Sequence, residues 1–191
     1  MKLVLVRHAK DPDTWNNSHR ALSIGGYLCA ALLGAVIRFG RYTRPTRHLP
    51  VIASDMARAE STARIMFGTQ LLATNASLRE AADADLPPRL RGPDWIGSGE
   101  RWCDVVERVG NELMDSIAAD DDVIWVTHSG VMDAVKEVLF DTSNLAEFDP
   151  GYLWMLVLDI NPDPGDSFAS TQTIISYFGP ALYGLRYFSD Q

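Results

Sequence analysis

The alternation of short apolar runs with segments of helical periodicity constrains the fold of this chain more than any other feature. Residues 3–6, 51–53 and 123–126 are short apolar runs typical of strands that are covered on both faces of a sheet. Segments with apolar side chains at helical spacing follow these runs. The expected helices cover residues 23–39, a segment from a cap at Ser54 or Asp55 to about residue 66, and residues 100–118 and 130–140. This order predicts an α/β protein with a mostly parallel sheet.

Two later segments are expected to add an antiparallel edge to the sheet. Residues 152–160 and 171–178 are β-rich and flank the turn-rich stretch NPDPGDS, so they should pair as a hairpin. The predicted fold class is therefore a three-layer α/β/α sandwich with a mostly parallel central sheet and an antiparallel edge. Residues 1–191 are expected to form a single domain, which suits the length of the chain.

Composition and charge exclude several classes of partner. The formal net charge of −8 argues against nucleic acid, because proteins that bind it carry a basic surface. No apolar run approaches the roughly 18 residues of a membrane span, and no signal peptide is recognisable. Cys29 and Cys103 lie in apolar helical patterns without metal-binding spacing, so they are expected to be reduced core thiols. These features predict a cytoplasmic protein without nucleic-acid or membrane partners.

Arginine and histidine residues follow three of the expected strands. The first strand ends in Arg7 and His8, the helix after the second strand carries Arg58, and the third strand ends in His128. Ligands of parallel α/β sheets bind outside the carboxyl ends of the strands, so these side chains should face one crevice. Arginine matches phosphate oxygens, and a helix N-terminus adds free N–H groups. The arrangement predicts a phosphate site, and neither histidine has a metal-binding spacing.

Four motifs in this order resemble those of the histidine phosphatase superfamily, the phosphoglycerate-mutase-like family. They are LVRHA, with Ala9 in the place of the family's glycine, SDMARAESTA, which aligns Arg58, the Leu-x-Glu that ends at Glu80, and WVTHSGVM, which aligns His128. The stretches LSIGG and GSGERW are also similar to family motifs. The resemblance spans nearly the whole chain and implies the phosphoglycerate-mutase-like fold.

The resemblance implies a role for each aligned residue. His8 is the implied nucleophile that attacks phosphorus and forms a phosphohistidine, while Arg7, Arg58 and His128 bind the phosphoryl oxygens. Glu80 is the implied general acid and then the general base, and Asp83 and Asp85 are the alternatives. His8, Glu80 and His128 are thus the expected catalytic residues. No metal and no cofactor is implied, and the ligand is phosphate or a small phosphorylated substrate.

The two residues that directly follow the implied nucleophile differ between the branches of this family. Ala9 and Lys10 depart from the mutase pattern, and RHAK is similar to small phosphohistidine phosphatases. The leading prediction is a metal-independent phosphomonoesterase for a small phosphorylated metabolite. The alternatives are a protein phosphohistidine phosphatase, a phosphoglycerate mutase, and a catalytically silent member that binds phosphate. The loop at 81–99 is a candidate lid, and an exposed C-terminal sheet edge is a candidate homodimer contact.

Overall fold

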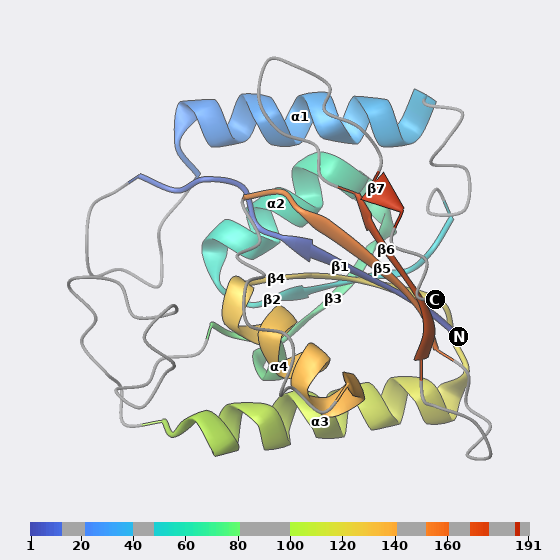
Figure 1. Ribbon diagram of the computed structural model, residues 1–191. Helices are drawn as coiled ribbons and strands as arrows, with labels where there is room; N and C mark the ends of the chain where they lie inside the picture. Colours follow the sequence, from blue (N-terminus) through green and yellow to red (C-terminus); the bar gives the residue numbers. More distant parts are fainter. Residues whose placement is uncertain are drawn as a thin grey trace.

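A seven-stranded sheet forms the centre of the protein in this computed structural model (Figure 1). The structure describes residues 1–12, 22–39, 48–80, 100–140 and 152–160, with the backbone alone at 38–39, 140, 169–175 and 186–187. The strands are β1 (Lys2–Arg7), β2 (Val51–Ser54), β3 (Leu71–Asn75), β4 (Val123–Thr127), β5 (Met155–Ile160), β6 (Ala169–Ile175) and β7 (Arg186–Tyr187). Their order across the sheet is β3-β2-β4-β1-β5-β6-β7.

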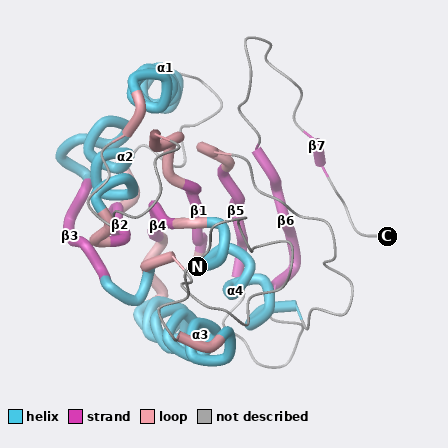
Figure 2. Tube along the Cα trace, turned by 90° about the vertical axis from the view of Figure 1, so that its left-hand side faces the viewer, coloured by secondary structure: helices cyan, strands magenta, loops and turns pink. Residues whose placement is uncertain are grey.

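Figure 2 shows the strands side by side in this order, and their pairings divide the sheet into a parallel half and an antiparallel half. β1 pairs with β4, β4 with β2 and β2 with β3 in parallel, whereas β5, β6 and β7 pair antiparallel. The four parallel strands therefore end at one edge, where loops leave β1, β2 and β4. The expected hairpin is confirmed by the pairing of β5 with β6.

Helices cover both faces of the sheet and complete the predicted α/β/α sandwich (Figure 1). The helices are α1 (Ile24–Phe39), α2 (Ala57–Phe67), α3 (Trp102–Ala119) and α4 (Ser129–Phe140). Side chains of α1 and α2 pack against one face of the sheet, and those of α3 and α4 pack against the other. Alternate residues of β1 and β4 point into the two layers, since both strands are buried on both faces.

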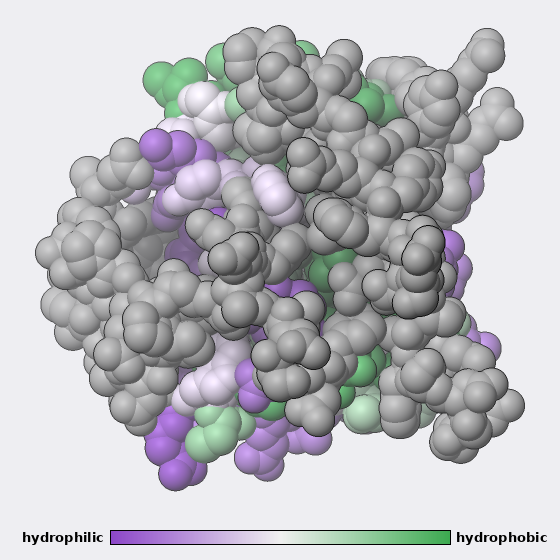
Figure 3. Space-filling model, in the orientation of Figure 1, coloured by the Kyte–Doolittle hydropathy of each residue, from purple (hydrophilic) through white to green (hydrophobic). Residues whose placement is uncertain are grey.

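The apolar side chains that identify α1 in the sequence lie mostly on its solvent face. Ile24 is 84% exposed and Leu32 is 69% exposed, while the buried side carries Ala30, Leu33 and Ile37. Figure 3 shows hydrophobic atoms along this side of the molecule. The packed side is set by a close approach of the backbones, because a Cβ on Gly34 would lie 2.8 Å from the Met66 Cα.

Two local predictions were wrong, and one strand was missed. The N-cap of α2 is Met56 and not Ser54 or Asp55, because the Ser54 hydroxyl faces the sheet edge and accepts the Met56 N–H at 3.3 Å. Cys29 and Cys103 are exposed free thiols and not core residues. The edge strand β3 was not expected; its three central residues are exposed, unlike those of the inner strands, which are buried on both faces. None of the described helices is both long and apolar enough to cross a membrane.

Candidate active site

The carboxyl ends of β1 and β4 bring two histidines into contact. Arg7 lies opposite Thr127 in the parallel register, and the His8 backbone N–H donates to the Thr127 carbonyl at 2.8 Å. His8 and His128 therefore leave the sheet side by side, with ring centroids 4.9 Å apart. Both side chains are buried. The contact between the two rings shows that the two strand ends lie side by side, as expected.

The His8 imidazole is oriented by one backbone group and one arginine. Nδ1 lies 2.8 Å from the Ala9 carbonyl oxygen, which can only accept, so Nδ1 carries the proton. Nε2 then presents a lone pair, and it accepts the Arg58 Nε–H at 3.2 Å. Burial is the main cause that holds the pKa of His8 well below 6.5, and the charges of Arg58 and Arg7 lower it further. His8 is therefore a neutral imidazole at neutral pH.

Thr62 ties the loop after β1 to the helix that carries Arg58. Its Oγ1 accepts the Ala9 N–H at 3.0 Å and donates to the Arg58 carbonyl at 2.7 Å. The same loop places Asp11 beside the site, with its Oδ2 4.0 Å from Arg58 Nε. Sequence reasoning assigned no role to Thr62 or Asp11, although Thr62 lies in the SDMARAESTA motif.

A tyrosine in the turn before β5 supports the other side of β1. The Arg7 guanidinium lies 4.5 Å above the Tyr152 ring, and the edge of this ring packs on His8 at a centroid distance of 5.5 Å. Leu153 follows with φ +61 and donates its N–H to the Arg7 carbonyl at 3.1 Å. A branched side chain rarely adopts this backbone conformation, so the contact fixes Tyr152 at some cost in strain.

His128 has a different environment from His8. Its Nε2 lies 3.0 Å from Ser54 Oγ, at the end of β2, while its buried Nδ1 makes no hydrogen bond to the described residues. Glu80 Oε2 lies 3.6 Å from that Nδ1, and Glu80 Oε1 accepts the N–H of Gly130 at 3.1 Å. Burial, followed by the nearby His8 and the arginines, holds the pKa of His128 well below 6.5.

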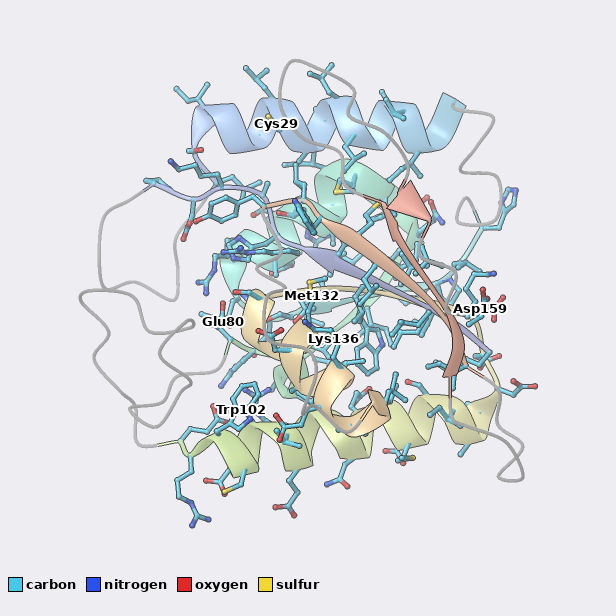
Figure 4. All side chains as sticks on the ribbon, viewed as in Figure 1. Cys29, Glu80, Trp102, Met132, Lys136 and Asp159 are labelled. Carbon is cyan, nitrogen blue, oxygen red and sulfur yellow. The ribbon has the colours of Figure 1, made fainter. Side chains whose placement is uncertain are left out.

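The backbone just before Glu80 is held in place by Arg108, a residue of α3 that sequence reasoning missed. Arg108 donates to the Ser77 carbonyl at 2.5 Å and to the Arg79 carbonyl at 2.9 Å, and it pairs with Glu100 at 2.6 Å. These contacts hold the end of the short 3-10 helix η3 (Ala76–Leu78). Figure 4 shows Glu80 close to the N-terminal end of α4, where its Oε1 accepts the Gly130 N–H.

Five predicted residues thus meet at one edge of the sheet. They are Arg7, His8, Arg58, Glu80 and His128. Asp83 and Asp85, the alternatives to Glu80, and the candidate lid at 81–99 lie outside the described residues. Among the described residues, His8, Glu80 and His128 are also a group whose ligand atoms, all within 4.8 Å of one another, could hold a metal ion.

Several solved structures share the fold of this chain. A mycobacterial glucosyl-3-phosphoglycerate phosphatase is 23% identical, with 82% of this chain and 89% of that chain covered and a TM-score of 0.60. A phosphoserine phosphatase from Entamoeba histolytica, solved with phosphoserine, is 13% identical over 90% and 95% of the chains, with a TM-score of 0.66. YhfR from Bacillus stearothermophilus is 21% identical over 87% and 93%, with a TM-score of 0.63. No family model and no curated protein sequence matches the chain.

These likenesses define the class of fold. The chain has the phosphoglycerate-mutase-like fold that these structures share, which confirms the predicted fold class. The mycobacterial phosphatase was also solved in complex with inorganic phosphate.

Proposed function

We propose that this protein is a metal-independent phosphomonoesterase that hydrolyses a small phosphorylated metabolite through a phosphohistidine at His8. The observation that carries the proposal is the orientation of His8. Its Nδ1–H is tied to the Ala9 carbonyl, so the lone pair of Nε2 is directed at Arg58. A neutral imidazole nitrogen beside a guanidinium is placed to attack a phosphorus atom whose oxygens that guanidinium binds.

In the first step, His8 Nε2 forms a bond to phosphorus as the bond from phosphorus to the ester oxygen breaks. Arg7, Arg58 and His128 bind the three other phosphoryl oxygens and stabilise the charge that develops on them. Glu80, protonated when substrate binds, gives its proton to the leaving oxygen, so that an alcohol departs. The product on the enzyme is a phosphohistidine at His8.

In the second step, water attacks the phosphohistidine and the N–P bond breaks. Glu80, now a carboxylate, accepts a proton from this water as the new P–O bond forms. Inorganic phosphate leaves, and His8 returns to its neutral form with the lone pair on Nε2. Burial and the two arginines favour that neutral form, because they hold the pKa of His8 well below 6.5.

The direct test is hydrolysis of an aryl phosphate in the presence of EDTA. Wild-type protein is expected to turn over, and His8→Ala is expected to reduce turnover to background. His48, an exposed histidine outside the site, supplies the matched control, and His48→Ala is expected to keep full activity. Activity that needs added divalent metal, or that survives His8→Ala, contradicts the proposal.

A protein phosphohistidine phosphatase is the second candidate, because Lys10 follows the nucleophile in the RHAK pattern and is exposed. A phosphohistidine peptide and a panel of phosphorylated metabolites, assayed side by side, separate the two. We expect the highest kcat/KM for a metabolite. A higher value for the peptide supports the second candidate, net transfer between positions of phosphoglycerate supports a mutase, and phosphate binding without turnover supports a silent member.

We also propose that the protein acts in the cytoplasm as a homodimer. The described part of the end strand, β7, is two residues long and offers few backbone groups for pairing. The exposed apolar side chains of α1, including Ile24, Leu28 and Leu32, offer a self-complementary helix face instead. Sedimentation is expected to give a dimer for wild type and a monomer for Leu32→Asp, and a monomeric wild type contradicts the proposal.

A further inference from the structure

A side chain from outside the four sequence motifs touches both the phosphate-binding arginine and the nucleophile of the proposed site. The Arg7 guanidinium lies over the face of the Tyr152 ring, with Cζ 4.5 Å from the ring centroid. The same ring meets the His8 imidazole edge-on, at a centroid distance of 5.5 Å and an interplanar angle of 65°. We propose that Tyr152 is a positioning residue that fixes the Arg7 guanidinium for the phosphoryl group, and this inference rests on the proposed function.

The contact with Tyr152 holds Arg7 without cancelling its charge. Arg79, by comparison, is held by a carboxylate, because it donates two hydrogen bonds to Asp55. A carboxylate partner occupies N–H donors and offsets the positive charge, and both effects oppose the binding of phosphate. An aromatic face attracts a guanidinium through the ring quadrupole instead. An arginine held in this way keeps its charge and can still offer N–H groups to phosphate oxygens.

The backbone beside Tyr152 is also tied to Arg7. The Arg7 N–H donates to the Trp154 carbonyl at 2.9 Å, and the Leu153 N–H donates to the Arg7 carbonyl at 3.1 Å. These bonds continue the antiparallel pairing of β5 with β1 into the turn before β5. The ring and the guanidinium therefore come from backbone segments that are hydrogen-bonded to each other, which fixes the distance between them.

Leu153 adopts a backbone conformation that is rare for leucine. Its φ is +61, and its side chain is buried. In the described part of the chain, the other non-glycine residue with positive φ is Asp120, the C-cap of α3, and helix ends often adopt this conformation. Leu153 lies in a turn and not at a helix end. Strained residues persist where the surrounding structure holds them, and they cluster at functional sites. The strain therefore supports a functional role for the turn that carries Tyr152.

A guanidinium that is already fixed lowers the cost of binding phosphate. A free arginine side chain has many rotamers, and a ligand that orders it loses affinity for that reason. Because the Tyr152 ring holds Arg7 beforehand, less conformational entropy is lost when phosphoryl oxygens bind. The orientation of His8 depends on the Ala9 carbonyl and on Arg58, which a change at Tyr152 leaves in place. Loss of the ring is therefore expected to weaken the binding of phosphate more than the chemical step.

The test measures the binding of inorganic phosphate by isothermal titration calorimetry, so it does not depend on turnover. Tyr152→Leu is expected to weaken phosphate binding by about three- to thirtyfold, the range that a cation–π contact can supply. Tyr152→Phe keeps the ring and is expected to bind phosphate as the wild type does. Tyr27, an exposed tyrosine of α1, supplies the matched control, and Tyr27→Leu is expected to leave the affinity unchanged.

Tyr152→Met is a second variant without a ring, and urea denaturation checks that each variant is folded. It is expected to lose as much phosphate affinity as Tyr152→Leu. Phosphate affinity that is the same in these two variants as in the wild type overturns the proposal. An equal loss in Tyr152→Phe and Tyr152→Leu also overturns it, because the hydroxyl and not the ring would then carry the effect.

Coupling to Arg7 separates positioning from a general loss of structure. In an Arg7→Gln background, titrated to higher phosphate concentrations, Tyr152→Leu is expected to cost no further affinity, and an equal cost in both backgrounds overturns the proposal. With an aryl phosphate, Tyr152→Leu is expected to raise KM and to leave kcat nearly unchanged, and a fall in kcat alone contradicts the positioning of Arg7. A protein that binds phosphate without turnover refutes the proposed function, while the titrations still decide the role of Tyr152. Wild-type protein that binds no phosphate overturns both.

Discussion

The ends of β1 and β4 carry histidines in equivalent places, and the two histidines differ in what surrounds them. His8 has its Nδ1 tied to the Ala9 carbonyl and its Nε2 against Arg58. His128 has its Nε2 against Ser54, while its Nδ1 faces the Glu80 carboxylate at 3.6 Å. Both are buried and both have a lowered pKa, so burial alone does not distinguish them.

The difference in partners assigns different chemistry to the two strand ends. A lone pair beside a guanidinium suits a nucleophile for phosphorus, because the guanidinium also binds the phosphoryl oxygens. A histidine beside a carboxylate that is held at a helix N-terminus suits proton transfer and oxygen binding. The β1 end is therefore the covalent side of the proposed site, and the β4 end is the side of the leaving group.

The largest difference is expected between His8→Ala and His128→Ala. Loss of a nucleophile costs on the order of 10⁶-fold in kcat, whereas loss of one group that stabilises developing charge costs about 10²–10³-fold. Steady-state kinetics with an aryl phosphate measures both. Equal losses in the two variants would break the distinction between the strand ends.

Glu80→Gln is expected to lower kcat by about 10²–10⁴-fold for an alkyl phosphate, because the alkoxide leaving group needs a proton. The loss is expected to be much smaller for p-nitrophenyl phosphate, whose leaving group departs as an anion. Glu60→Gln serves as the control, because Glu60 pairs with Arg64 on the surface of α2, away from the site. A loss that is the same for both substrates would show that Glu80 does not protonate the leaving group, and Asp83 and Asp85 would then be tested in the same way.

Two buried hydroxyl groups, those of Thr62 and Ser54, hold the β1 end and the β4 end in place, and their removal compares the two ends. Thr62→Val leaves the Ala9 N–H without its partner, and Ser54→Ala removes the partner of His128 Nε2. Each is expected to cost about 1–3 kcal/mol in the free energy of unfolding, measured by urea denaturation. We expect Thr62→Val to slow formation of the phosphohistidine, because it frees the loop that orients His8. Unchanged single-turnover rates in Thr62→Val would contradict that positioning role.

The smallest effect concerns pH. The pKa of each histidine lies well below 6.5 in the folded protein and returns to about 6.5 on unfolding. Below about pH 6.5 the unfolded chain takes up protons that the folded protein does not, so stability falls as the pH falls, by up to about 1.4 kcal/mol per pH unit for each histidine. Urea denaturation at several pH values is expected to show the contribution of one histidine in His8→Asn and in His128→Asn, which is half of the combined contribution of the two histidines in the wild type. An unchanged slope in either variant would show that the histidine concerned does not titrate in this way.

The sequence was sufficient to predict where the candidate site residues meet, because their meeting depends on a simple rule. Parallel strands end at one edge, so the residues after β1, β2 and β4 had to meet there, and the motifs supplied Arg58 and Glu80. Tyr152 and Arg108 were not predictable in this way. Their contacts depend on the antiparallel pairing of β5 with β1 and on the packing of α3 against η3, and neither leaves a local pattern.

The helix α1 shows a second limit of sequence patterns. Its periodicity identified a helix, but the large apolar residues Leu28 and Leu32 point to solvent. Small residues decide which face packs, because Gly34 allows the backbone of α2 to approach closely. The predicted cap of α2 was wrong for a related reason. The Ser54 hydroxyl contacts His128 Nε2 and does not cap the helix, whose N-cap is Met56.

The central claim is that His8, and not His128, carries the phosphoryl group. Rapid quenching of the protein with a ³²P-labelled substrate, followed by peptide mapping under alkaline conditions that preserve phosphohistidine, tests it most directly. The label is expected on the peptide containing His8 in the wild type and in His128→Ala, and it is expected to be absent from His8→Ala. Label on His128, or turnover by the wild type without any labelled histidine, would contradict the account.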